Sequence, residues 1–223
     1  IISRSSEHLT YGNFIVKNAS AQIKTSLMLY SLLQNGTSTI KCNLPTRDHL
    51  EILLDYLNFP VKLIDRKIII NGSIHSNVGF NISLPGDISS AAFIIAASIL
   101  LKGSNITLKN MLINEHRMGF INLLLKMGAK IKILNNKKHF GENVADINIK
   151  YSNNLSGIDI DSKTVVSMID EIPIFCIVAS LATFNSNIYG INELRLKESD
   201  RVNSILLNLN KMGGSISEKN DKL

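Results

Sequence analysis

The stretch AAFIIAASILL, residues 91–101, decides the fold of this chain because it predicts a helix with no polar face. A helix of that kind has to be surrounded by protein. The stretch is too short to cross a bilayer, which takes about 20 apolar residues in a row. Residues 105–109 alternate instead, with Ile106 and Leu108 against Thr107 and Lys109. Such alternation indicates a strand in a sheet with one solvent-exposed face. We therefore expect helices in the interior of the protein and sheets on its outside.

The same succession of elements recurs along the chain: a strand, an apolar helix, a strand, an amphipathic helix and two more strands. Such self-similarity identifies repeated structural units. In the first copy we expect strands at 13–17 and 37–41, helices at 21–33 and 47–57, and a hairpin at 61–70. In the second copy, which starts at Asn81, we expect helices at 89–101 and 117–127 and strands at 105–109, 130–134 and 146–150. In the third copy, which starts near Ile158, we expect helices at 171–183 and 199–212 around a strand at 187–190.

Composition argues against several classes of protein. The net charge of +6 could favour binding to nucleic acid, to a membrane surface or to anionic metabolites. The lysines are scattered, however, and 6% aromatic residues with no Trp give no stacking platform for bases.

Cys42 and Cys176 form no CxxC or Cys/His cluster, so we expect buried free thiols in a reducing cytoplasm. The chain begins without Met or a signal peptide, so we expect it to be a piece of something longer.

The segment ELRLKESDR, residues 193–201, is the strongest candidate for chemistry. It leads into an apolar-periodic helix for which Ser199 is a plausible N-cap. On a continuous helix Lys197 and Arg201 point the same way, and Glu198 lies towards the buried face. Two cations and a carboxylate at a helix N-terminus suit an anionic substrate that also needs proton transfer. The alternative is a solvated first turn held together by salt bridges.

Four collinear stretches resemble the EPSP synthase family, the 3-phosphoshikimate 1-carboxyvinyltransferases. They are SAQIKTS at 20–26 with TRDH at 46–49, PGDISSAA at 85–92, DEIP at 170–173 and LRLKESDR at 194–201. The resemblance extends from about Gly12 to Gly214. It implies an α/β fold, the inside-out α/β barrel of the enolpyruvyl transferase type, built from repeated βαβαββ units. Residues 1–84 would then be the C-terminal part of a first lobe, with one unit and a remnant, and residues 85–223 about two units of a second, incomplete lobe.

The resemblance also implies an activity. Family members transfer the enolpyruvyl group of phosphoenolpyruvate to the 5-hydroxyl of shikimate 3-phosphate, a step of chorismate and aromatic amino-acid biosynthesis, with no metal or organic cofactor. A full-length cytoplasmic monomer that binds these two small molecules, and neither nucleic acid nor membrane, is the expectation. Family segments that hold further substrate contacts have no counterpart between residues 1 and 223, so we expect the piece alone to be inactive or nearly so.

The resemblance gives particular residues a role. Asp170 and Glu198 would be the acid/base groups, with Asp170 accepting the proton of the 5-hydroxyl. Shikimate 3-phosphate would contact Asp170 and five further residues: Ser20, Ala21, Gln22, Arg47 and Lys197. Phosphoenolpyruvate would contact Gln22 and Arg201. From the residues alone, Ser20 is an ordinary N-cap and Asp170 an N-cap carboxylate before Pro173. We expect the two sets to line opposite walls of one cleft.

Two other functions are compatible with parts of the sequence. The first is UDP-N-acetylglucosamine enolpyruvyl transferase, which has the same fold and donor, although its charged segment does not resemble residues 195–201. The second is a non-catalytic basic fragment that only binds a partner. Binding of shikimate 3-phosphate rather than a UDP-sugar would separate the first of these, and a salt-dependent response to single-stranded oligonucleotides would revive the second.

Overall fold

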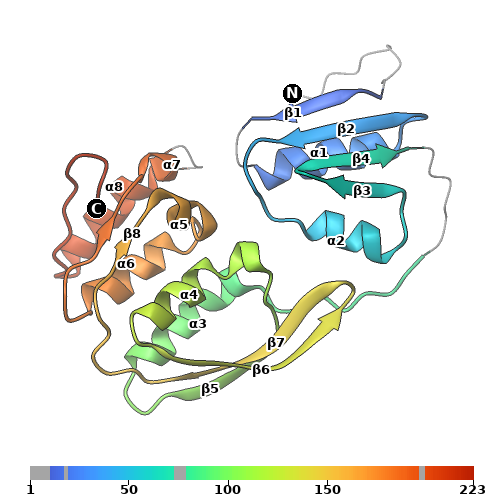
Figure 1. Cartoon of the computed structure of the whole chain (residues 1–223). Helices are drawn as coiled ribbons and strands as arrows, with labels where there is room; N and C mark the ends of the chain where they lie inside the picture. The colour runs from blue at the N-terminus through green and yellow to red at the C-terminus, as the bar shows by residue number, and fades with distance from the viewer. Residues whose placement is uncertain (1–10, 18–19, 73–78, 196–198) are drawn as a thin grey trace. The chain divides into compact units, whose positions relative to one another are not determined.

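The computed structural model describes residues 11–17, 20–72, 79–195 and 199–223. The chain divides into two compact units (Figure 1). Unit 1 comprises Ile1–Ser83 with His139–Glu142, and unit 2 comprises Leu84–Lys138 with Asn143–Leu223. Each unit has its own buried apolar cluster, so each is described by itself.

Unit 1 is a single βαβαββ repeat. Its elements are β1 (Asn13–Val16), α1 (Ala21–Leu32), β2 (Thr37–Cys42), α2 (His49–Tyr56), β3 (Val61–Ile64) and β4 (Lys67–Asn71). The strands form one sheet in the order β1-β2-β4-β3, in which β1 and β2 are parallel and the other neighbours are antiparallel. The core lies between this sheet and α1, where Met28, Ile40 and Ile70 are fully buried. The expected succession of elements is therefore confirmed for the first copy.

The second copy has the same order of elements, with longer strands. Its elements are α3 (Ile88–Leu100), β5 (Asn105–Leu112), the 3-10 helix η1 (Glu115–Arg117), α4 (Gly119–Lys126), β6 (Lys130–His139) and β7 (Glu142–Lys150). The sheet order is β5-β7-β6, with β7 antiparallel to β5. A single parallel bridge between Gly86 and Met111 stands where β1 pairs with β2 in the first copy. The first strand of this repeat is thus reduced to one bridge.

The third copy contains less sheet and more helix. Its elements are β8 (Asp159–Ile160), α5 (Ser162–Ser167), α6 (Ile172–Ser180), β9 (Asn187–Ile188), α7 (Asn192–Arg195) and α8 (Arg201–Lys211). The two short strands are parallel, as the first two strands of a βαβαββ unit should be. Helices α3, α6 and α8 pack into one apolar cluster that includes Ile95, Phe175 and Val202. Figure 1 shows α3 and α4 lying together on one side of the β5-β7-β6 sheet.

The helix that predicts the fold is buried on one side only. Ile88, Ala92 and Ile95 in α3 are fully buried, as the apolar sequence requires. Phe93 and Ile94 in the same helix are 62% and 53% exposed. The expectation that every side of this helix is covered is therefore wrong for the described residues, because they supply packing partners for one face.

The starts of α4 and α8 differ from the sequence predictions. Arg117 lies in the 3-10 helix η1 and not in α4, which begins at Gly119. The N-cap of α8 is Asp200, whose carboxylate accepts a hydrogen bond from the Asn203 N–H at 3.0 Å, and not Ser199. Since Ser199 and Asp200 are not helical, the continuous helix expected through Lys197 and Arg201 does not form.

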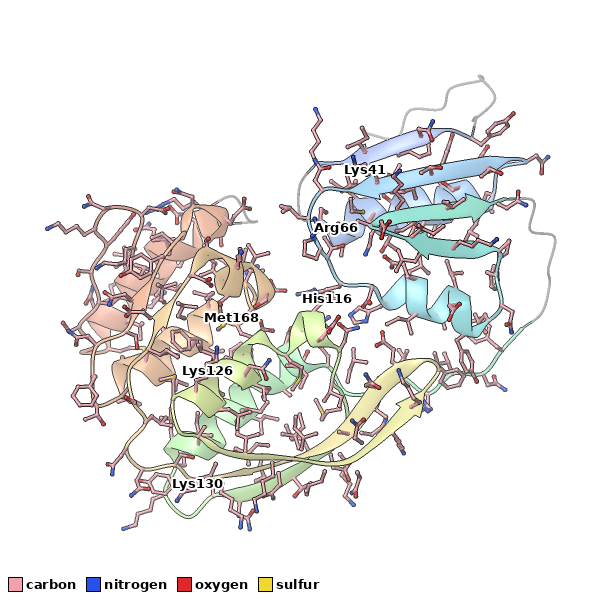
Figure 2. The ribbon with its side chains drawn as sticks, in the orientation of Figure 1. Lys41, Arg66, His116, Lys126, Lys130 and Met168 are labelled. Carbon is pink, nitrogen blue, oxygen red and sulfur yellow. The ribbon has the colours of Figure 1, made fainter. Side chains whose placement is uncertain are left out.

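Basic side chains are distributed over many elements. Lys126 ends α4, Lys130 begins β6, and Lys41 lies in β2, as Figure 2 shows. Arg66 lies in the turn between β3 and β4 and donates a hydrogen bond to the Asn43 carbonyl at 3.4 Å. Among the described residues, no helix is both long and apolar enough to span a membrane.

Candidate functional site

The start of α1 presents the first group of predicted site residues. Ser20 is the N-cap, and its hydroxyl accepts a hydrogen bond from the Ile23 N–H at 3.3 Å, which confirms the cap predicted from the sequence. Ala21 and Gln22 are the first two residues of the helix, and Gln22 is exposed. Backbone N–H groups of a first helical turn have no partner within the helix and attract anions. This end of α1 therefore has the chemistry of an anion site.

Arg47 belongs to the same unit and precedes α2 by two residues. Its backbone carbonyl accepts a hydrogen bond from Nζ of Lys24, a buried residue of α1, at 2.7 Å. The same Nζ lies 2.5 Å from Oε1 of Glu51 in α2. The segment with Arg47 is thus attached to α1 by a buried lysine. Sequence reasoning missed Lys24 and Glu51, because a single Lys and a single Glu on two separate helices look like surface residues.

Asp170 and Arg201 come together in unit 2. Nη1 of Arg201, the first residue of α8, donates to Oδ1 of Asp170 at 3.1 Å and to the Ile169 carbonyl at 3.2 Å. Asp170 lies in the turn before α6, and the N-cap of that helix is Glu171. The alternative interpretation of Asp170 as an N-cap is therefore wrong. Its carboxylate instead accepts a hydrogen bond from a half-buried guanidinium.

Glu171, next to Asp170, is only 3% exposed. Burial raises the pKa of its carboxyl group, while a hydrogen bond from Ser89 acts in the opposite direction and the neighbouring Asp170 charge raises the pKa further. Ser89 also accepts a hydrogen bond from Nη2 of Arg117 at 2.6 Å, and that nitrogen lies 2.5 Å from Oδ1 of Asp87. The starts of α3 and α6 are therefore joined by a cluster of charged and polar side chains.

Asp87 has two functions in this cluster. It is the N-cap of α3 and accepts a hydrogen bond from the Ser90 N–H at 3.0 Å. Burial on its own would raise the pKa of Asp87, but the hydrogen bonds from Ser90 and the charge of Arg117 outweigh it and hold the pKa below its ordinary value. Residues 86–90 therefore form the capped start of α3.

The charged segment at 193–201 agrees in part with each of its two interpretations, a substrate site and a solvated turn held together by salt bridges. Arg195 ends α7 and binds Asp200 at 2.6 Å and Glu218 at 2.5 Å. This part of the segment forms exposed salt bridges, as the alternative interpretation predicted. Arg201 turns instead to Asp170. Lys197 and Glu198, predicted as a substrate contact and an acid/base group, lie outside the described residues.

Two hollows lie within unit 2. The first, of about 190 Å³, has apolar walls from α6 and α8, and Arg201 contributes to its lining. The second, of about 460 Å³, lies between the end of α6 and the C-terminal segment 214–223. Asp170 lines neither of them. Within the described part of the chain, no group of His, Cys, Asp and Glu side chains is arranged to hold a metal ion.

The structure thus brings the predicted residues together in two sets. Ser20, Ala21 and Gln22 belong with Arg47 in unit 1, and Asp170 contacts Arg201 in unit 2. Polar groups that sequence reasoning did not assign to the site support both sets. They are Lys24 and Glu51 in unit 1, and Asp87, Ser89, Arg117 and Glu171 in unit 2.

Comparison with known proteins gives a consistent result. Residues 2–223 match the family model of EPSP synthase (3-phosphoshikimate 1-carboxyvinyltransferase). A 3-phosphoshikimate 1-carboxyvinyltransferase of Legionella pneumophila is 40% identical over 215 residues, which are 96% of this chain and 49% of the relative. One of Clostridium tetani is 40% identical over 202 residues, 90% of this chain and 45% of the relative. The chain therefore spans about half the length of the curated relatives that it matches.

Solved structures agree with the sequence relatives. The EPSP synthase of Acinetobacter baumannii superposes with a TM-score of 0.86 at 35% identity, covering 97% of this chain and 48% of that one. The enolpyruvyl transferase NikO of Streptomyces tendae superposes with a TM-score of 0.64 at 15% identity, covering 83% of this chain and 45% of that one, which shows the fold alone. The predicted enolpyruvyl transferase fold is confirmed, and the UDP-N-acetylglucosamine enzyme is not favoured. Because the family model matches residues 2–223, nearly the whole of this chain, the chain belongs to the EPSP synthase family.

Proposed function

We propose that this chain is part of an enzyme that transfers the enolpyruvyl group of phosphoenolpyruvate to the 5-hydroxyl of shikimate 3-phosphate and releases phosphate. The observation that carries the proposal is the family match over residues 2–223. The reaction needs a group that accepts the hydroxyl proton, a proton donor for the methylene carbon, and cations for two phosphates and a carboxylate. The residues in both units are of these kinds.

In unit 1 we assign shikimate 3-phosphate to the start of α1. Ser20, Ala21 and Gln22 would bind the 3-phosphate and the ring through a hydroxyl, backbone N–H groups and an amide. Arg47 would add a planar, charged donor that suits phosphate. Gln22 would also contact phosphoenolpyruvate.

The other repeats support this assignment. In the second copy, the arginine two residues before the amphipathic helix, Arg117, binds the carboxylate that caps the apolar helix, Asp87. In the first copy Arg47 occupies the same position before α2, but the cap of the apolar helix is Ser20, which brings no charge. A phosphate at the start of α1 would supply the negative charge that Asp87 supplies in the second copy.

In unit 2 we assign proton transfer to Asp170 and phosphoenolpyruvate binding to Arg201. Asp170 would take the proton from the 5-hydroxyl while the hydroxyl oxygen attacks C2 of phosphoenolpyruvate. In the same step C3 of phosphoenolpyruvate gains a proton and becomes a methyl group. The tetrahedral adduct then loses a proton from C3 and phosphate from C2, which re-forms the C2–C3 double bond and leaves the enol ether product. Glu198 would be the second acid/base group, and Lys197 would contact the 3-phosphate. A cytoplasmic monomer that uses no metal or organic cofactor is the form we propose for the complete enzyme.

Activity should be tested in a full-length form, meaning a polypeptide that joins this chain to the half that its relatives have in addition. Release of phosphate from phosphoenolpyruvate should require shikimate 3-phosphate. Asp170→Asn should lower turnover by about 10²- to 10⁴-fold, the usual range for a general base, and leave substrate binding nearly unchanged. Arg201→Ala should mainly raise the KM for phosphoenolpyruvate. Asp65→Asn, the same chemical change in the exposed β3–β4 turn, is the matched control.

Three results would contradict the assignment. Near-normal turnover of Asp170→Asn would remove Asp170 from the mechanism. Use of a UDP-sugar in place of shikimate 3-phosphate would replace the acceptor. Salt-dependent binding of single-stranded oligonucleotides, without phosphate release, would favour a binding module instead.

A further inference from the structure

Lys24 is a charged residue in the core of unit 1. It lies in the second turn of α1, is 3% exposed, and pairs at 2.5 Å with Glu51 of α2, which is also buried. Lysine and glutamate are almost never this deeply buried unless they are paired. Burial raises the pKa of the Cys42 thiol in β2, the Lys24 charge lowers it and the Glu51 charge raises it, so the pair lies near this strand of the sheet.

Lys24 makes a second contact that an ion pair alone does not need. Its Nζ donates a hydrogen bond of 2.7 Å to the backbone carbonyl of Arg47. Lys24 follows Gln22 by two residues on the same helix. One buried ammonium group therefore connects the start of α1 to the backbone of Arg47, and these are the two segments to which we assign shikimate 3-phosphate.

We propose that Lys24, held by Glu51, is a positioning residue that fixes the backbone of Arg47 relative to the N-terminus of α1, so that both segments contact the 3-phosphate of one substrate molecule. This inference rests on the proposed function. Binding groups have to be held to within about 0.5 Å of their productive positions by contacts that lie behind them. Lys24 is such a contact, because its ammonium group is buried while Gln22 is exposed.

Stability alone is a poor explanation for the pair. Desolvation of two buried charges offsets much of their attraction, and well-packed apolar residues of similar volume are often as stable or more so. Oε2 of Glu51 is buried and meets no hydrogen-bond partner among the described residues, which adds to the cost of the pair. An apolar pair would avoid these costs, but it would give the Arg47 carbonyl no donor.

This contrast defines the test. The double variant Lys24→Met/Glu51→Leu replaces the ion pair by apolar side chains of similar size and leaves no unpaired charge in the core. We expect its urea unfolding midpoint to equal or exceed that of the wild-type chain. In the full-length form, we also expect at least tenfold weaker binding of shikimate 3-phosphate to the double variant in isothermal titration calorimetry. Lys62→Met, which removes an exposed lysine of β3, should change neither measurement.

Two further variants separate positioning from general damage. Glu51→Gln keeps Lys24 and its bond to the Arg47 carbonyl, so affinity should stay within threefold of the wild type. Lys24→Arg keeps a charge beside Glu51 but changes the length and shape of the donor, so affinity should fall at least threefold. Lys24→Arg decides the question if the double variant does not fold. In the full-length form, the double variant should raise the KM for shikimate 3-phosphate and leave kcat within threefold.

The outcomes distinguish this inference from the proposed function. A wild-type full-length form that does not bind shikimate 3-phosphate overturns the proposed function, and the positioning role with it. A wild-type full-length form that binds, together with folded Lys24→Met/Glu51→Leu and Lys24→Arg variants that bind equally well, overturns the positioning role alone. Tenfold weaker binding by a folded double variant, with Lys62→Met unchanged, supports it.

Discussion

Asp87→Ala is the most informative single change in unit 2, because Asp87 both caps a helix and binds an arginine. Its carboxylate accepts from the Ser90 N–H at 3.0 Å and from the Ser90 hydroxyl at 2.9 Å, and it forms the 2.5 Å contact with Nη2 of Arg117. Asp161 caps α5 through the Thr164 N–H at 2.8 Å, and its described hydrogen bonds include no arginine. The two variants therefore differ mainly in the Arg117 contact.

The magnitude follows from these contacts. Loss of an N-cap costs about 1 kcal/mol, which applies to both variants. A hydrogen bond to a charged group adds about 1.5–3 kcal/mol where it is shielded from water. The Asp87 side chain is 42% exposed, and the Arg117 side chain only 15%, so we take the lower end of that range. Asp87→Ala should then cost about 2–3 kcal/mol and Asp161→Ala about 1 kcal/mol.

Urea unfolding followed by far-UV circular dichroism measures the difference. The two costs differ by about 1–2 kcal/mol, so with a slope of about 1–3 kcal/mol per molar urea, Asp87→Ala should unfold at a midpoint lower than that of Asp161→Ala by about 0.3–2 M. Since the pKa of Asp87 is held below its ordinary value of about 4, its contribution is present above that pH and is lost as the pH falls through the lower pKa of the folded state. Equal midpoints for the two variants at pH 7 would refute a stabilising Asp87–Arg117 contact.

Four further experiments test other parts of the structure. Because burial raises the pKa of Glu171, its carboxyl favours the folded state at acid pH and loses that advantage as the pH rises through the raised pKa. Glu171→Gln should therefore raise the urea midpoint at pH 8 and flatten the dependence of that midpoint on pH above the ordinary pKa of 4.5. Burial raises the pKa of the Cys176 thiol to about 12, so iodoacetamide at pH 8 should modify it at least 100-fold faster in urea than in the folded chain, as peptide mass spectrometry can follow. Gly157→Ala should destabilise unit 2 in thermal unfolding, because a Cβ there would lie 2.0 Å from the Phe184 carbonyl oxygen. Ser20→Asp should keep the cap of α1 and the unfolding midpoint, since Asp caps as well as Ser, yet abolish calorimetric binding of shikimate 3-phosphate by repelling its phosphate.

The spacing of apolar residues, together with residues that cap or end helices, was enough to predict most elements. Helix α1 was expected at 21–33 and occupies Ala21–Leu32, and β2 was expected at 37–41 and occupies Thr37–Cys42. Both predictions succeed because the signals are local: Ser20 caps the helix, and Gly36 follows it with a backbone φ of 155°. The repeated order of elements is likewise a one-dimensional property of the chain.

Tertiary partners could not be predicted in the same way. Nothing local distinguishes Lys24 from a surface lysine, because its partner Glu51 is on another helix and the Arg47 carbonyl is a backbone group. The start of α8 was misplaced for a related reason: Ser199 and Asp200 are both good caps, and Arg195 binds Asp200 from the preceding helix. Burial of a charge or choice of a cap depends on residues that are distant in sequence.

The repeats share a contact between their two helices, and the sequence shows only one side of it, the arginine near the start of the second helix. Arg47, Arg117 and Arg201 each stand at or just before the second helix of their repeat. In the later copies the arginine binds a carboxylate at the start of the apolar helix, Asp87 or Asp170. In the first copy that helix is capped by Ser20, and the backbone of Arg47 is bound to α1 through Lys24.

The chemical difference between the repeats follows from the residue at the start of the apolar helix. A carboxylate there neutralises the arginine within the protein, as Asp87 does for Arg117. A serine there satisfies a backbone N–H but leaves the positive potential of the helix N-terminus to an anion from outside. On the roles proposed above, repeats with one backbone plan would serve as a structural clamp, a proton-transfer pair or a phosphate site. The residue at the start of the apolar helix, and not the presence of the arginine, would then determine which of these roles a repeat has.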